Sequence, residues 1–357
     1  MEQKPMQGAL PSGGQKVSLE GTFRGKYRVF AVFLICCALL VAAFAFSAVW
    51  MHRGGEDWFF GFGGHDASES EPSDTAMPES ESKPPISQEP ALPEIPKDAV
   101  SVTDKDLSAV SLGRFYLHNE TIYHPDVERL LEEDLSRPAA TDRPTVLILH
   151  THTSESYLPQ GTAYITEPHG DLIYSRDEKE NILAVGETLC RALNEKGITA
   201  LHCTVMHDEP SMSGSYTRAA ETIKRYLEQY PEIEYVVDLH RDAVTTADGK
   251  IVRSAGKTVS GEEVAQIMAI VGSDGNGTQL DQWEENLALA LQLREKLNGE
   301  GGSVCRPVSL RNESFNQESA RHSLLLEIGT SGNSLEEAKR AAILLADALA
   351  ELIQPLS

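Results

Sequence analysis

Three short segments of this sequence are almost wholly apolar and lie far apart along the chain. They read TVLIL at residues 145–149, YVVDL at 235–239 and SLLLEI at 323–328. Runs of this length, without alternation of polar and apolar residues, are typical of strands buried on both faces of a sheet. Because such a sheet needs helices packed against it, these segments favour an α/β fold.

The segments between these runs show helical and strand patterns in turn. Residues 181–196 have helical periodicity and are followed by Gly197, a residue type that commonly ends helices. Further patterns predict helices at 215–229, 282–297 and 335–353, and strands at 200–205 and 264–271. The alternation predicts an α/β domain with a mixed, mostly parallel sheet flanked by helices.

An uncharged apolar run near the N-terminus sets a second constraint. Residues 29–50 would form a helix of about 30 Å, long enough to cross a bilayer. Basic residues precede this run and acidic residues follow soon after Arg53, so the positive-inside rule places the N-terminus in the cytoplasm. A cleaved signal peptide is the alternative, but its apolar core spans only about 7–15 residues.

A polar spacer follows the apolar run. Residues 66–97 are rich in Pro, Ser and Glu, and such a segment cannot bury enough apolar surface to offset the entropy cost of ordering. The predicted organisation is that of a single-pass membrane protein, with a cytoplasmic tail at 1–28, a transmembrane helix at 29–51, a disordered linker at 52–101 and an extracytoplasmic globular domain at 102–357.

Charge and cysteine content argue against a nucleic-acid-binding protein and against a fold held together by disulfides. The net charge of −23 argues against a surface that follows nucleic-acid phosphates. Cys36 and Cys37 lie in the apolar run, and the other cysteines, Cys190, Cys203 and Cys305, match neither a metal knuckle nor a disulfide framework. We therefore expect no nucleic-acid partner and no disulfide scaffold.

Residues that can bind a metal or move a proton follow or end each of the three apolar segments. His150 and His152 follow the first, with Glu155 just beyond, His240 follows the second, and Glu327 ends the third. Ligands gather at the carboxyl ends of the strands in an open α/β sheet, so we expect these side chains to converge. A structural role for each histidine is the alternative.

Zinc suits this set of residues. Catalytic zinc takes two or three His or carboxylate ligands and keeps one position open for water, whose pKa it lowers towards about 7. A nearby carboxylate can then accept the proton of the water and pass it to a leaving amine. An acidic side chain directly after SLLL, such as Glu327, would be costly to bury without a partner or a task.

The same segments resemble the stage II sporulation protein P family. The resemblance rests on VLILHTHTSESYLP at 146–159, VVDLHRDA at 236–243 and LLLEIGTSGNSLEEAKRAA at 324–342, and it covers about 142–353. It implies a peptidoglycan amidase and endopeptidase of endospore engulfment, with a fold similar to the zinc-dependent N-acetylmuramoyl-L-alanine amidases. It also implies stage II sporulation proteins D and M as partners.

The resemblance implies a role for each candidate residue. His152 and His240 match the two zinc histidines. His150, two residues before His152, is an alternative to it. Glu327, in a Glu-x-Gly pattern, matches the catalytic glutamate. The resemblance leaves the third zinc ligand open.

In the amidases that ligand is a Glu shortly before an Asn that opens the first long helix. Asn181 is a candidate for that Asn, but Asp177 stands four positions before it. Glu178 and Glu180 are close by, and Glu155 competes with them because it lies nearest to the first histidine motif.

One arginine and the polar residues of one loop are candidate contacts of the substrate. The guanidinium of Arg241 is permanently charged and cannot ligate a metal, so we expect it to bind a carboxylate of the stem peptide or to anchor Asp242. Arg311, Asn312 and Asn316, in the loop before the last strand, are expected to contact glycan or peptide.

These features predict hydrolysis of the amide that joins the muramyl lactyl group to L-alanine in peptidoglycan, with or without cleavage of peptide cross-links. A different extracytoplasmic zinc peptidase or deacetylase could use the same ligands. A wall-binding scaffold with structural histidines is the non-enzymatic alternative.

Overall fold

The computed structural model describes residues 96, 99–108, 117–135, 142–166, 173–299 and 301–353. All of them belong to one compact unit, Gln88–Ser357. The predicted tail and transmembrane helix lie outside the described residues, as does most of the predicted linker. Strand β1 begins at Val100, two residues before the predicted start of the domain. None of the described helices is both long and apolar enough to span a bilayer.

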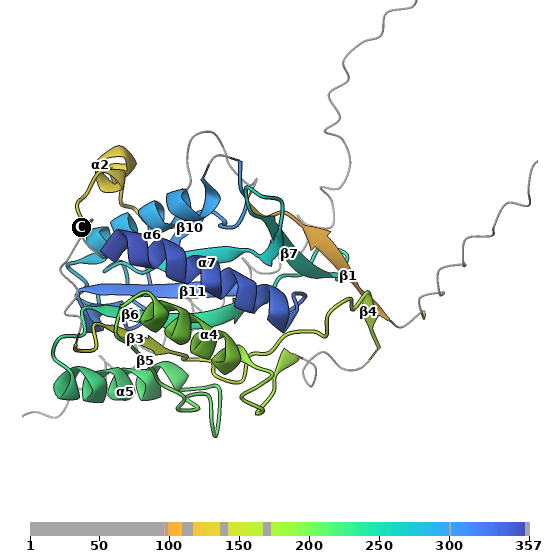
Figure 1. The fold of residues 1–357 in the computed structure, drawn as a ribbon, viewed down its shortest axis with the longest axis horizontal. Coiled ribbons are helices and arrows are strands. Elements are labelled where there is room, and N and C mark those ends of the chain that lie inside the picture. Colours follow the sequence, from red (N-terminus) through yellow and green to blue (C-terminus); the bar gives the residue numbers. More distant parts are fainter. Residues whose placement is uncertain are drawn as a thin grey trace, which may run out of the picture. The chain divides into compact units, whose positions relative to one another are not determined.

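The larger sheet contains seven of the described strands, in the order β2-β10-β9-β11-β6-β3-β5 (Figure 1). Their bounds are β2 Leu117–Asn119, β3 Val146–Leu149, β5 Ala200–His202, β6 Tyr235–Asp242, β9 Ile267–Val271, β10 Val308–Leu310 and β11 His322–Thr330. Strands β5, β3, β6 and β11 are mutually parallel, β9 is antiparallel to β11, and β9, β10 and β2 are parallel. The predicted mixed, mostly parallel sheet is confirmed.

The three apolar segments form the neighbouring strands β3, β6 and β11. The predicted ends of two of them are wrong, because β6 continues to Asp242 and β11 to Thr330. His240 therefore lies within β6 and not after it, and it is paired with Glu327 of β11 in the parallel register. The backbones keep pairing past the point where the side chains become polar.

The two faces of this sheet are covered differently. Helices α4 Ile182–Glu195, α6 Trp283–Asn298 and α7 Leu335–Ile353 pack on what we call the helix face (Figure 1). Val237, Leu239 and Leu326 lie in the core that these helices share with the sheet. On the opposite face, the site face, helix α5 Ser215–Gln229 packs on Leu147 and Val236. The remaining described helices are the short α2 Val127–Leu131, which contacts α6, and the 3-10 helix η1 Gln317–Ser319.

The long helices agree with the sequence prediction to within one residue at each end. Asn181 caps α4, since its side chain accepts a hydrogen bond from the backbone N–H of Leu183 at 3.0 Å. The single strand predicted at 264–271 is wrong. It is divided at Gln266, whose side-chain amide donates to Asp106 and to the Ser303 carbonyl and so directs the two halves into different sheets.

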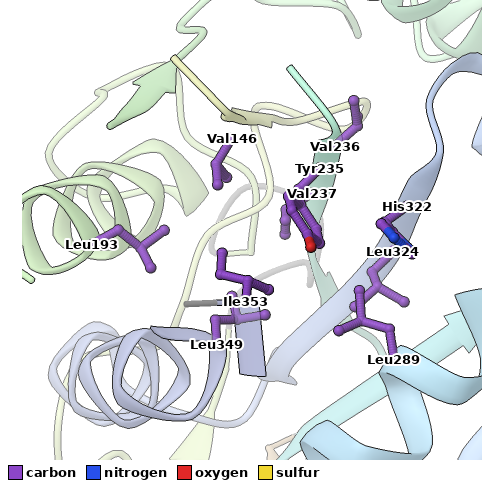
Figure 2. A pocket seen from close by; sticks show the side chains of 10 residues that line it. All are labelled: Val146, Leu193, Tyr235, Val236, Val237, Leu289, His322, Leu324, Leu349 and Ile353. Atoms are coloured by element: carbon purple, nitrogen blue, oxygen red, sulfur yellow. The ribbon is translucent and has the colours of Figure 1, made fainter. Parts of the chain in front are cut away.

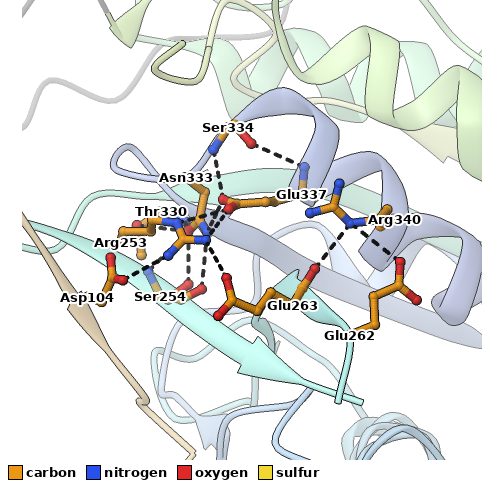
Figure 3. Close-up of polar contacts among 10 residues, drawn as sticks. All are labelled: Asp104, Arg253, Ser254, Glu262, Glu263, Thr330, Asn333, Ser334, Glu337 and Arg340. Carbon is orange, nitrogen blue, oxygen red and sulfur yellow. Dashed lines mark hydrogen bonds and ion pairs between the residues drawn. The ribbon is translucent and has the colours of Figure 1, made fainter. Parts of the chain in front are cut away.

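A smaller sheet, which the sequence did not predict, has the order β4-β1-β7-β8. Its strands are β1 Val100–Lys105, β4 Tyr164–Ile165, β7 Ile251–Lys257 and β8 Glu263–Ala265. Arg253 of β7 donates to Glu337 in the first turn of α7 at 2.9 Å and to Asp104 of β1 at 3.0 Å (Figure 3). Asn333 accepts from the backbone N–H groups of Ser254 and Thr330. These contacts fix the carboxyl end of β11 to the smaller sheet.

A small apolar cavity lies at the amino ends of β6 and β11 (Figure 2). Its volume is about 10 Å³, enough for one water at most. The rings of Tyr235 and His322 stack beside it with centroids 4.9 Å apart. Both residues begin their strands, five positions before His240 and Glu327. This part of the core is close-packed and offers no room for a substrate.

Gly186 lets α4 approach the sheet closely. A Cβ at this position would lie 2.5 Å from the Nε2 atoms of both His150 and His202. We predict that Gly186→Ala lowers the free energy of unfolding by about 1–3 kcal/mol through overpacking, although alanine favours a helix over glycine by about 1 kcal/mol.

Urea unfolding measures this effect, with the exposed neighbour Glu187→Ala as the matched control. The control should change stability by less than about 0.5 kcal/mol. A Gly186→Ala variant as stable as the wild type would contradict the close packing.

Candidate metal centre and catalytic carboxylate

His152, Glu155 and His240 form a group of possible metal ligands on the site face. One ligand atom from each lies within 4.8 Å of the others. Nδ1 of His152 is 3.5 Å from one carboxylate oxygen of Glu155, and Nδ1 of His240 is 3.7 Å from the other. The loop after β3 supplies the first two residues and β6 supplies the third. Residues predicted from separate motifs thus come together.

The group fits zinc in donor type and in spacing. Two ligands of a tetrahedral zinc, with bonds of about 2.0–2.2 Å, lie about 3.4 Å apart, close to the separations of Glu155 from each histidine. Burial lowers the pKa of His240, but the carboxylates of Asp238 and Glu155 outweigh this effect and raise its pKa to about 10. The surroundings of the ring therefore stabilise positive charge at this place.

Asp238 orients the ring of His240. Its carboxylate lies 3.1 Å from Nε2 of His240 and accepts two hydrogen bonds from Thr151, at 2.8 Å from the backbone N–H and 2.6 Å from the hydroxyl. A carboxylate on one imidazole nitrogen leaves the other nitrogen free to ligate. The sequence analysis did not identify this residue, although an aspartate inside the apolar run 235–239 was a usable signal.

Glu155 is held by the backbone around it. One of its carboxylate oxygens accepts from the N–H of Arg241 at 2.8 Å, and its carbonyl accepts from Ile182 at 2.8 Å, where α4 begins. Glu180 instead lies on the surface, with its carboxylate 3.3 Å from the hydroxyl of Ser175. The structure thus brings Glu155, and not Glu180, to the two histidines.

His150 lies apart from the group, buried on the helix face against α4. Its Nδ1 donates to the carbonyl of Leu239 at 3.0 Å, and its Nε2 lies 2.9 Å from Nε2 of His202. Burial and the neighbouring His202 lower the pKa of His150 to about 3. Because both ring nitrogens of the neutral His150 have partners, its position is that of a structural residue. Of the two histidines in this segment, only His152 belongs to the group of possible metal ligands.

Glu327 lies beside His240 in the neighbouring strand. Burial raises the pKa of its carboxyl to about 8, although the charge of His240 opposes the shift. Its Oε2 atom is buried and has no hydrogen-bond partner among the described residues. A desolvated carboxyl without a partner is costly in a folded protein and is characteristic of groups that act on a ligand.

Two of the predicted substrate contacts, Arg241 and Asn316, bond to backbone carbonyls of the protein itself. Arg241 is buried and donates to the carbonyls of Ile173 at 2.7 Å and Asp242 at 3.3 Å, with its guanidinium carbon 5.5 Å from the ring centre of Tyr174. The side chain of Asn316 donates to the carbonyl of Tyr216 at 2.9 Å. Both side chains therefore support the loops around the metal group.

Two aromatic residues that the sequence analysis missed stand next to the metal group. The ring of Tyr216, in the first turn of α5, lies 5.6 Å from that of His152 and 6.4 Å from that of His240. Phe315 lies 6.1 Å from Tyr216. Phe315 and Asn316 both have left-handed backbones, with φ of 53° and 60°. Strain of this kind persists where surrounding contacts hold a loop in place, often at functional sites.

Comparison with known proteins identifies the family. The family description "Stage II sporulation protein P (SpoIIP)" matches residues 66–350. The chain belongs to this family. The family resemblance inferred from the three sequence motifs is thereby confirmed.

A curated relative is stage II sporulation protein P of Bacillus subtilis, which is 28% identical over 232 residues. The match covers 62% of this chain and 54% of the relative, so it spans about half of the relative's length. Among solved structures, an apo N-acetylmuramyl-L-alanine amidase of Mycobacterium abscessus aligns with a TM-score of 0.38 and 12% identity. That alignment covers 59% of this chain and 99% of the other.

The role of Asp238 can be tested through metal affinity. We predict that Asp238→Asn weakens zinc binding by about 10- to 100-fold, because the ring of His240 loses its charged partner. Competition with a chromogenic chelator measures the affinity, and circular dichroism checks folding. Asp347→Asn, which changes a half-exposed aspartate of α7, should bind zinc like the wild type. Equal affinities for both variants would contradict the orienting role.

Proposed function

We propose that this chain is a membrane-anchored, zinc-dependent peptidoglycan hydrolase that acts in engulfment during endospore formation. Its substrate bond would be the N-acetylmuramoyl–L-alanine amide. The observation that carries the proposal is the position of the unpartnered Glu327 carboxyl next to the group of His152, Glu155 and His240. Membership of the sporulation protein family supports a cell-wall substrate.

Each residue of the site would have a separate role in the reaction. His152, Glu155 and His240 would hold the zinc, which when bound polarises the scissile carbonyl and lowers the pKa of water to about 7. Glu327 would accept the proton of the attacking water and deliver it to the leaving nitrogen. A cation in the adjacent group favours the ionised form of Glu327, so the carboxylate can act as a base at neutral pH. Asp238 would keep the ring of His240 in its ligating orientation.

The same residues could cleave peptide cross-links, which are also amides. The mass of each released fragment separates the two reactions, because amidase action frees an intact stem peptide from the glycan. It also separates both from deacetylation, which releases acetate and leaves the peptide in place.

Glu327→Gln tests the assignment of the base. We predict that this variant folds normally and binds zinc, yet releases muropeptides about 10²- to 10⁴-fold more slowly. The amide keeps the shape of Glu327 but cannot accept a proton at neutral pH. His240→Ala should instead lose the metal, and Glu318→Gln, at an exposed position of η1, should behave like the wild type.

Zinc content, melting temperature and mass analysis of digested cell wall provide the measurements on the full chain. Near-normal release by folded, zinc-loaded Glu327→Gln would show that another residue is the base. Loss of zinc from the same variant would make Glu327 a ligand.

We also propose that residues 29–50 remain in the mature protein as the membrane anchor, with stage II sporulation proteins D and M as partners. The length of the apolar run and its flanking charges support the anchor. We expect protein recovered from sporulating membranes to retain these residues when its N-terminus is sequenced. A mature N-terminus beyond Met51 would refute the anchor.

A further inference from the structure

A pocket of about 510 Å³ opens on the site face next to the catalytic carboxyl. Glu327 forms one part of its wall and Asp242, two residues after His240 in β6, forms another. The other lining residues are apolar or basic, apart from one serine: Leu107, Leu117, His118, Met268, Ile270, Arg306, Pro307, Ser309 and Arg311. The pocket thus reaches the carboxyl that is proposed as the base, Glu327.

The floor of the pocket follows from the register of the sheet. Met268 of β9 is paired with Glu327 of β11, and Ile270 of β9 is paired with Ser309 of β10. Residues paired in this way point to the same face. Strand β9 alternates between buried and half-buried residues, and the half-buried Met268 and Ile270 are those that line the pocket. The floor therefore offers apolar contact to a ligand.

Arg306 supplies a fixed positive charge at this pocket. Its Nη1 donates to Asp242 at 2.7 Å, and its backbone N–H donates to the carbonyl of Ile267 at 2.7 Å. Asp242 is itself held, because its other oxygen accepts from the N–H of Ala243 at 2.7 Å. A guanidinium has five N–H donors in a planar fork that matches a carboxylate. One ion pair fixes this fork and leaves it able to take a second acceptor.

The orientation of the reaction decides which part of the substrate occupies the pocket. Glu327, which would deliver a proton to the leaving nitrogen, faces the pocket. The peptide attached to that nitrogen should therefore lie on this side. In a stem peptide, alanine is followed by a glutamate joined through its γ-carboxyl, so a free α-carboxylate stands one residue from the scissile amide.

We propose that the pocket binds the stem peptide of the substrate and that Arg306 pairs with the α-carboxylate of its γ-linked glutamate. This inference rests on the proposed function for the position of the scissile bond. Arg306 and Arg311 line the pocket beside Asp242 and Glu327, and Arg311 is itself paired with Glu120. Among the described residues, the guanidinium of Arg306 donates a hydrogen bond to Asp242 alone, so its remaining donors favour an anionic group on the ligand. Asp242 of the DLHRD motif then acts as the positioning residue for Arg306.

Two muramyl peptides that differ in one group test the proposal. One carries the free α-carboxylate on its glutamate, and the other carries the α-amide. We expect the full wild-type chain to prefer the free acid by roughly ten- to hundredfold in kcat/KM, the effect of a charge-assisted hydrogen bond pair. Arg306→Gln should bring the ratio of the two kcat/KM values close to one.

The ratio is informative even where a substitution lowers activity on both substrates. Arg306→Lys keeps the charge without the planar fork, so its ratio should be intermediate, and it replaces Arg306→Gln if that variant does not fold. Arg191→Gln, at an exposed position of α4, should keep the wild-type ratio. An unchanged ratio in folded Arg306→Gln or Arg306→Lys would overturn the assignment.

Binding of the free stem peptides, measured by calorimetry, separates this inference from the proposed function. The same preference for the free acid, dependent on Arg306, is expected without any bond cleavage. If both muramyl peptides remain intact while this binding preference is found, the proposed hydrolysis is wrong and the peptide pocket stands. If both are hydrolysed equally well by the wild type, the proposed hydrolysis stands and the carboxylate contact is wrong.

Discussion

The parallel pairing of β6 with β11 is the interaction on which the site depends. It places His240 and Glu327 in register on one face of the sheet, so a candidate metal ligand and a carboxyl group come together through backbone hydrogen bonds. Rigid strands hold such a pair more accurately than loops do. The helix face of the same strands contributes Leu239 and Leu326 to the core, so the fold and the site are stabilised by the same two strands.

The site carries more acidic groups than a buried region holds without compensation. Asp238, Glu155 and Glu327 surround His240, whose raised pKa reflects their negative charge. A cation bound by the proposed ligands would compensate these charges, and its binding would then contribute to the stability of the folded state. Glu327 faces both this group and the pocket that contains Arg306. One carboxyl thus connects the proposed chemistry with the proposed recognition of the peptide.

The strongly periodic helices and strands could be predicted from the sequence, but the long-range hydrogen bonds that arrange the site could not. Helix α7 has the predicted bounds because its apolar periodicity is regular. Strand β7, which reads IVRSAGK, has too little apolar character to be recognised alone. The choice of Glu155 over Glu180 depends on the backbone N–H of Arg241, which lies 86 positions away in sequence. Such contacts exist only once β3 and β6 are paired.

Anomalous X-ray diffraction at the zinc absorption edge, from crystals of the full chain grown with zinc, tests the central claim most directly. The account predicts one strong peak with bonds of about 2.0–2.2 Å to His152, Glu155 and His240, and with the carboxyl of Glu327 next to the open coordination position. A peak on His150 or Glu180, or a peak with Glu327 as a ligand in place of Glu155, would contradict it.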